Sequence, residues 1–169
     1  MIEGFSGSGK TTTSKYIFGD IEKLFGKTVI LDGNKIRLFF KAAGYSIGYS
    51  KLERSQASHP IGELVKLFLN QNINIICTFV GLNNKGRKIL KEKIKNLIII
   101  LIKTNVEDIV KKGKKKHVYK LKKNIVGVDI LPEFPRNPDI VVNNDFKKSI
   151  KHLSAELVDK LKKLKIKNE

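Results

Sequence analysis

A glycine-rich segment near the start of the chain constrains its fold more than any other feature. Gly4, Gly9, Lys10 and Thr11 complete the pattern GxxxxGK[ST]. In this pattern the glycines let successive backbone N–H groups wrap a phosphate, the lysine contacts the terminal phosphates, and the hydroxyl ligates Mg²⁺. A helical pattern follows, and the positive end of a helix favours the same anion. The sequence therefore predicts a site for ATP and Mg²⁺, formed by Ser6, Gly7, Ser8, Gly9, Lys10, Thr11 and Thr12.

Apolar runs alternate with helical patterns along the rest of the chain, and the runs are continuous, as in strands covered on both faces. This alternation predicts an α/β fold of the P-loop NTPase type, a three-layer sandwich with a mostly parallel sheet and helices on both faces. No repeat or linker divides residues 1–169, so we expect a single domain. The predicted strands are 1–3, 29–31, 73–80, 97–102 and 140–142, and the predicted helices are 10–25, one from near 35, one from near 60, and 149–166.

Glu3 is unexpected in this scheme. It stands in the first strand, directly before the phosphate loop, where a small or apolar residue is expected. We therefore expect this strand to be truncated or frayed, and the sequence offers no physical account of the carboxylate.

The charge is strongly unbalanced. The chain carries 34 Lys and Arg against 16 Asp and Glu, a formal net charge of +18. A surplus of this size attracts polyanions and steers anionic ligands. However, only four of these cations are arginines, whereas readers of bases and phosphates favour the planar fork of Arg. We interpret the excess as a Lys/Ile/Asn coding bias, expect an anionic small molecule as substrate, and do not expect nucleic acid as the main partner.

Other protein classes are excluded on simpler grounds. The longest apolar run, 97–102, is far shorter than the ~20 residues of a membrane span. The N-terminus carries no basic segment followed by an apolar stretch and a cleavage site. The single cysteine, Cys77, allows neither a disulfide framework nor a Cys-type zinc site. We expect a cytoplasmic protein without a membrane segment.

Two further segments suit a phosphate-transfer site. Asp32 ends the second predicted strand, at the sheet edge where ligands bind in open α/β folds. A carboxylate there can hold a magnesium-bound water and take the proton of an attacking hydroxyl, although an Asp before Gly33 also suits a simple turn.

Residues 111–123 contain eight lysines and no acid. We predict a basic lid over phosphates at about 111–126, with a solvated loop as the alternative.

Several segments in order along nearly the whole chain resemble the adenylylsulfate (APS) kinase family. The phosphate loop resembles its GLSGSGKTT segment, residues 31–37 its LDGDNIR segment and residues 48–54 its GFSxxDR segment. The likeness implies transfer of the ATP γ-phosphate to a ribose 3′-hydroxyl of a nucleotide whose 5′-phosphate carries an anhydride group, usually sulfate. It also implies a homodimer. The remaining similar segments are 61–68, 118–120, 127–129 and 132–138.

The resemblance assigns roles to individual residues. Lys10 and Asp32 are the implied catalytic residues, and Thr11 and Asp32 the implied Mg²⁺ ligands. Arg37 and Arg54 fall at positions that grip the phosphates of the acceptor, and a retained Arg in a lysine-rich chain suits bidentate binding. The residues expected to bind the acceptor are Asn34, Arg37, Tyr49, Arg54, Lys120 and Ile125.

The departures from the family pattern fall mainly in the pocket for the acceptor base. Family members place the adenine between two phenylalanines, and this chain has Tyr49 and Ile125 there. An Asn of the family becomes Ala57, and a Ser becomes Gly81. A pyrimidine needs less stacking area, so we favour the reaction of a related enzyme, the cytidine diphosphoramidate kinase of bacterial capsule biosynthesis. The alternative is an adenylylsulfate kinase of sulfate assimilation, with Ile125 and Ala57 as drift.

Two hypotheses from other classes remain open at the level of sequence. A P-loop NTPase switch would hydrolyse ATP or GTP without an acceptor. A catalytically dead relative would bind nucleotide and transfer nothing.

Overall fold

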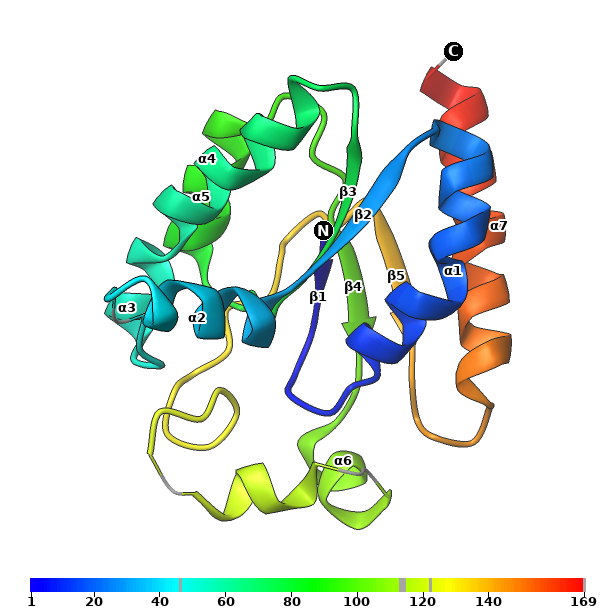
Figure 1. Cartoon of the computed structure of the whole chain (residues 1–169). Helices are drawn as coiled ribbons and strands as arrows, with labels where there is room; N and C mark the ends of the chain where they lie inside the picture. Colours follow the sequence, from blue (N-terminus) through cyan, green and yellow to red (C-terminus); the bar gives the residue numbers. More distant parts are fainter. Residues whose placement is uncertain (46, 113–114, 122, 169) are drawn as a thin grey trace.

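The computed structural model describes residues 1–45, 47–112, 115–121 and 123–168. Within them, five parallel strands form a sheet in the order β2-β3-β1-β4-β5. Helices cover both faces, so the predicted three-layer α/β sandwich is confirmed (Figure 1). The strands are β1 (Ile2–Glu3), β2 (Thr28–Asp32), β3 (Asn74–Thr78), β4 (Ile100–Lys103) and β5 (Ile140–Asn143).

Two helices cover one face of the sheet and three the other. Helices α1 and α7 pack together on the first face, where Ile17 and Leu157 are fully buried. Helices α2, α4 and α5 cover the second face, and α6 lies beyond the end of β4 (Figure 1). The helices are α1 (Lys10–Phe25), α2 (Gly33–Ala42), α3 (Lys51–Gln56), α4 (Ser58–Leu69), α5 (Asn84–Lys93), α6 (Val106–Lys112) and α7 (Ile150–Asn168), with a 3₁₀ helix, η1 (Lys116–Lys120).

Strand β1 is as short as expected, but the expectation of fraying is wrong. It lies in the middle of the sheet, with Ile2 paired to Thr78 of β3 and to Ile100 of β4. Ile2 and Glu3 are 1% and 0% exposed. Neighbours on both sides therefore fix a strand that is too short to be stable alone.

Two helices of the second layer were not predicted. The N-cap of helix α3 is Ser50, whose side chain and that of Glu53 form a reciprocal capping box. The N-cap of helix α5 is Asn83, whose side chain accepts a hydrogen bond from Gly86 N. Both helices contribute residues to the cavity described below, Arg54 from α3 and Arg87 from α5.

The predicted lid is described only in part. Gly113, Lys114 and Lys122 lie outside the described residues, while α6 and η1 account for most of the remainder. None of the helices in the described part of the chain has the length and apolar character needed to cross a membrane.

Candidate active site

The phosphate loop joins β1 to α1 and opens into a cavity of about 960 Å³ at the carboxyl ends of the strands. Gly7 and Gly9 have φ values of 84° and 99°, a left-handed conformation that favours glycine. A Cβ on Gly9 would lie 2.7 Å from Ile150, so the loop also needs glycine for close packing. The predicted ATP-binding residues that line the cavity are Ser6, Gly7, Gly9, Lys10, Thr11 and Thr12.

Ser8 is placed differently from the other predicted loop residues. Its side chain is fully buried away from the cavity, and its Oγ has no hydrogen-bond partner among the described residues. Its carbonyl accepts a hydrogen bond of 2.9 Å from Asn144, and its backbone N–H donates to Phe5 O. Ser8 therefore supports the shape of the loop in this structure.

Lys10 is folded back onto the loop. Its Nζ donates to Gly4 O at 2.9 Å and to Phe5 O at 2.6 Å, and the side chain is buried. Burial lowers the pKa of Lys10 to about 7, and the positive charge of Lys115 contributes in the same direction. The two carbonyls thus hold the amine at the cavity wall, where an anionic phosphate would favour its charged form.

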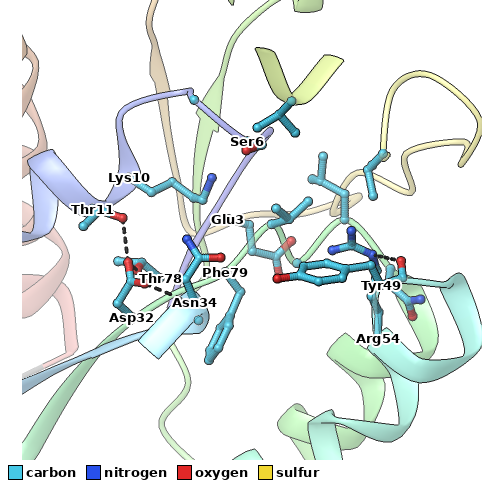
Figure 2. Close-up of a pocket in the computed structure, with 18 of the residues that line it drawn as sticks. Glu3, Ser6, Lys10, Thr11, Asp32, Asn34, Tyr49, Arg54, Thr78 and Phe79 are labelled. Carbon is cyan, nitrogen blue, oxygen red and sulfur yellow. Dashed lines mark hydrogen bonds between the residues drawn. The ribbon is translucent and has the colours of Figure 1, made fainter. Parts of the chain in front are cut away.

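The ends of β2 and β3 bring hydroxyl and carboxylate oxygens beside the loop. Asp32 Oδ2 accepts hydrogen bonds from Thr11 Oγ1 at 2.6 Å and from Thr78 Oγ1 at 3.1 Å (Figure 2). Such oxygen donors suit Mg²⁺, which keeps several waters and shares its remaining positions with substrate phosphates. No cluster of three or more His, Cys, Asp or Glu occurs among the described residues.

Asp32 also caps helix α2, because its Oδ1 accepts from the backbone N–H groups of Asn34 and Lys35. Burial by itself would raise the pKa of Asp32, but hydrogen bonds from Thr11, Asn34 and Thr78 outweigh it and leave the pKa below its ordinary value. The carboxylate is therefore ionised at neutral pH and fixed in direction.

Tyr49 and Arg54 lie across the cavity from Lys10 and Asp32 (Figure 2), and Arg37 lines the same cavity. The guanidinium carbons of Arg37 and Arg54 lie 4.5 Å and 5.5 Å from the centre of the Tyr49 ring. Arg54 donates from Nε to Tyr49 O at 2.6 Å, while Arg37 donates to the carbonyls of Ile47 and Gly48. Burial, followed by repulsion from Arg37, lowers the pKa of Arg54 to about 10, so Arg54 remains cationic at neutral pH. Burial also lowers the pKa of Arg37.

The other predicted acceptor residues are only partly brought together. Asn34 and Ile125 line the cavity, as does Ala57. Lys120 is exposed and does not line it. The described lysines of the lid that do are Lys112, Lys115 and Lys123.

The lid is joined to the phosphate loop through a tyrosine. Tyr119 of η1 is buried, and its hydroxyl donates to Ser6 O at 2.7 Å. Burial raises the pKa of this phenol, so it stays protonated and able to donate. This hydrogen bond fastens the 3₁₀ helix to the phosphate loop.

A buried ion pair lines the same cavity, and sequence reasoning missed it. Glu3 accepts hydrogen bonds from Arg87 Nε at 3.1 Å and from Arg87 Nη2 at 2.8 Å, and Arg87 is only 7% exposed. Gly81 makes room for this pair, because a Cβ there would lie 2.6 Å from Glu3 Cγ. The ion pair accounts for two departures from the expected sequence, the acidic Glu3 in β1 and Gly81 in place of the serine of the family pattern.

Comparisons with known proteins identify relatives of this chain. The family model described as adenylylsulphate kinase matches residues 1–143. The chain is 29% identical to an adenylyl-sulfate kinase of Thermodesulfovibrio yellowstonii, over 94% of this chain and 82% of the relative. It is 24% identical to the cytidine diphosphoramidate kinase of Campylobacter jejuni, over 95% of this chain and 94% of the relative.

A solved structure supports the fold. The APS kinase of Mycobacterium tuberculosis, in complex with AMPPNP and APS, superposes with a TM-score of 0.81 at 19% identity, covering 95% of each chain. The match to the family model spans the chain from β1 to β5. The protein therefore belongs to the adenylylsulphate kinase family, whose members phosphorylate a nucleotide 3′-hydroxyl.

Proposed function

We propose that this protein transfers the γ-phosphate of ATP to the ribose 3′-hydroxyl of cytidine diphosphoramidate, with Mg²⁺ as cofactor. The observation that carries the proposal is that one cavity is lined both by the phosphate loop and by two arginines. Lys10, Thr11 and Asp32 line this cavity, and so do Arg37 and Arg54. An acceptor nucleotide held by the arginines would then face the phosphate loop.

The chemistry required of the protein is positioning and charge stabilisation. Lys10 would leave the carbonyls of Gly4 and Phe5 and bind the terminal phosphates. Asp32 would orient the 3′-hydroxyl and accept its proton as the bond from the 3′-oxygen to the γ-phosphorus forms and the bond from that phosphorus to the β-phosphate oxygen breaks, which releases ADP. Thr11 and Asp32 would hold Mg²⁺, which would supply neutralisation of charge on the phosphates. Because the pKa of Asp32 is lowered, its main contribution is orientation rather than strong basicity.

The choice of cytidine rests on the pocket for the base. Ile125 and Ala57 line the cavity where the family pattern supplies an aromatic ring and an amide. Tyr49 therefore supplies the aromatic surface, and its ring already lies against two guanidinium groups. A pyrimidine loses less than a purine when one stacking face is aliphatic. Adenylyl sulfate is the second candidate, favoured by the relatives named adenylyl-sulfate kinase.

The experiment is a comparison of kcat/KM for the two acceptors at saturating ATP. We expect the cytidine compound to be preferred. Ile125→Phe restores a second stacking surface, worth about 1–3 kcal/mol for a base. It should raise kcat/KM for adenylyl sulfate by about tenfold and change that for the cytidine compound less.

The matched control is Ile125→Leu, which keeps an aliphatic side chain of the same size and should leave the ratio unchanged. A wild-type preference for adenylyl sulfate would overturn the choice of acceptor and leave the kinase activity in place.

A further inference from the structure

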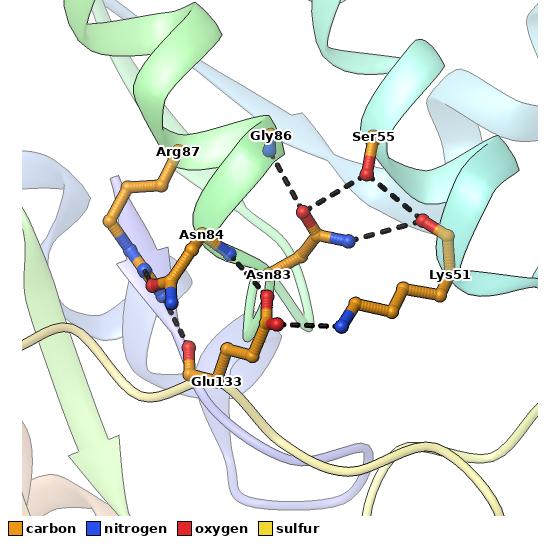
Figure 3. A network of polar contacts seen from close by, with 7 residues as sticks. All are labelled: Lys51, Ser55, Asn83, Asn84, Gly86, Arg87 and Glu133. Atoms are coloured by element: carbon orange, nitrogen blue, oxygen red, sulfur yellow. Dashed lines mark hydrogen bonds and ion pairs between the residues drawn. The ribbon is translucent and has the colours of Figure 1, made fainter.

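A chain of polar contacts links strand β1 to helix α3 across the second layer of the fold. Arg87 of α5 binds Glu3 of β1 and also donates from Nη2 to Glu133 O at 2.8 Å. The Glu133 side chain in turn reaches Lys51 of α3, with Oε1 2.6 Å from Lys51 Nζ (Figure 3). The strand that leads into the phosphate loop is thereby connected to the helix that carries Arg54.

Glu133 is the centre of this chain and is fixed at four points. Its Oε2 accepts from Asn84 N at 2.8 Å, while Oε1 accepts from Lys51. Its backbone N–H donates to Leu82 O at 3.0 Å, and its carbonyl accepts from Arg87. Glu133 itself does not line the cavity. Any effect it has on the reaction must therefore act through the residues that it holds.

Lys51 is held through its backbone as well as its side chain. Its carbonyl accepts from Asn83 Nδ2 at 3.1 Å and from Ser55 Oγ at 3.0 Å. Asn83 Oδ1 completes the network by accepting from Ser55 Oγ at 3.0 Å and from Gly86 N at 2.8 Å (Figure 3). The first residue of α3 is therefore fastened both to α5 and to the segment that follows the lid.

This fastening matters because α3 is only six residues long. A helix of that length is unstable by itself and depends on outside contacts for its position. Arg54 lies one turn after Lys51 and binds Tyr49 O and Asn124 O, the latter at 3.1 Å. A shift of α3 would therefore displace Arg54 and Tyr49 together, without disturbing Lys10 or Asp32.

We propose that Glu133 is a positioning residue for the acceptor nucleotide, acting through Lys51 to fix the place of Arg54 and Tyr49. The inference rests on the proposed function, because it assigns these two residues to the acceptor.

The test is Glu133→Gln, which keeps the size of the side chain but offers one oxygen to two donors, Lys51 Nζ and Asn84 N. We expect the KM for the acceptor to rise about threefold to tenfold, the value of one lost hydrogen bond. The kcat and the KM for ATP should stay within about twofold of wild type. In a Lys51→Met background the same substitution should have a smaller effect, because one of its two partners is already gone.

The control is Glu63→Gln, which removes another carboxylate paired with lysines, Lys66 and Lys93, on the exposed side of α4. It should leave both KM values unchanged. The proposal is overturned if Glu133→Gln changes the acceptor KM no more than this control, or raises the KM of both substrates equally.

A second measurement separates this inference from the proposed function. Hydrogen–deuterium exchange at residues 51–57 should be faster in Glu133→Gln than in Glu63→Gln, while exchange in α1 is the same in both. If the wild type transfers no phosphate to any acceptor, the proposed function fails, and unchanged exchange at 51–57 would refute the positioning by itself.

Discussion

The protonation of Lys10 gives a prediction whose size follows directly from the structure. Without nucleotide, burial holds the pKa of this amine at about 7, while its two hydrogen-bond acceptors are neutral carbonyls. A bound triphosphate places negative charge beside the amine and raises its pKa well above 7. Binding of ATP must therefore be coupled to uptake of a proton by Lys10.

The number of protons taken up depends on the fraction of Lys10 that is neutral before ATP binds. With a pKa of about 7, the neutral fraction is about 0.1 at pH 6, about 0.5 at pH 7 and about 0.9 at pH 8. Proton uptake should rise in the same steps, and ATP binding should weaken as the pH rises from 7 to 9. The direction of this pH dependence is fixed, because the pKa of Lys10 in the folded protein lies below that of the free side chain and bound ATP reverses that shift.

The assay is titration calorimetry of Mg²⁺-ATP binding, without acceptor, in buffers of different ionisation enthalpy at each pH. Lys10→Met is the reference, because it keeps a similar length, removes the titrating amine and retains every other ionisable group. Uptake close to zero at pH 8, or equal uptake by wild type and Lys10→Met, would show that Lys10 is already charged. The assignment of its low pKa to burial would then be refuted.

Two further predictions concern the other charged groups of the cavity. Asp32→Asn should lower kcat by about 10²–10⁴-fold, as expected for loss of a group that orients and deprotonates the hydroxyl, with a much smaller change in the ATP dissociation constant; a defect confined to ATP binding would make Asp32 only a magnesium ligand. Arg87→Met should lower the free energy of unfolding by about 3–5 kcal/mol in urea titrations, because it leaves the Glu3 carboxylate buried and unpaired. The double variant with Glu3→Leu should recover most of that loss, and a double variant as unstable as Arg87→Met would contradict the pairing argument.

The parts of the site that the sequence could predict are those that depend on short sequence motifs. The phosphate loop and Asp32 at the end of β2 each depend on residues close in the chain, and parallel strand order brings these two segments to one sheet edge. The roles of Tyr49 and Arg54, by contrast, were implied by the resemblance to the APS kinase family.

The contacts that sequence could not predict join residues far apart in the chain. Glu3 and Arg87 are 84 positions apart, and Lys51 and Glu133 are 82 apart. Neither pair leaves a periodic signal. Arg87 was nevertheless a clue, because it is one of only four arginines in a lysine-rich chain.

Helix α5 and the lid show two other limits. Among the residues of α5, only Ile89 and Leu90 are buried apolar side chains, which is too few to give a helical pattern. The lid contains eight lysines, and no sequence pattern sets one apart from another. The sequence therefore could not distinguish Lys120, which is exposed, from Lys115, which lines the cavity. The two lysines differ in their position relative to the phosphate loop, which is set by the hydrogen bond between Tyr119 and Ser6.

The measurement that tests the central claim most directly follows the label of γ-phosphate-labelled ATP in the presence and absence of cytidine diphosphoramidate. The account predicts that label moves to the ribose 3′-oxygen of the acceptor, located by phosphorus–proton correlation spectroscopy, and that ATP consumption requires the acceptor and is lost in Lys10→Ala. Release of label as inorganic phosphate at the same rate with and without the acceptor would contradict it, and would indicate an NTPase switch instead.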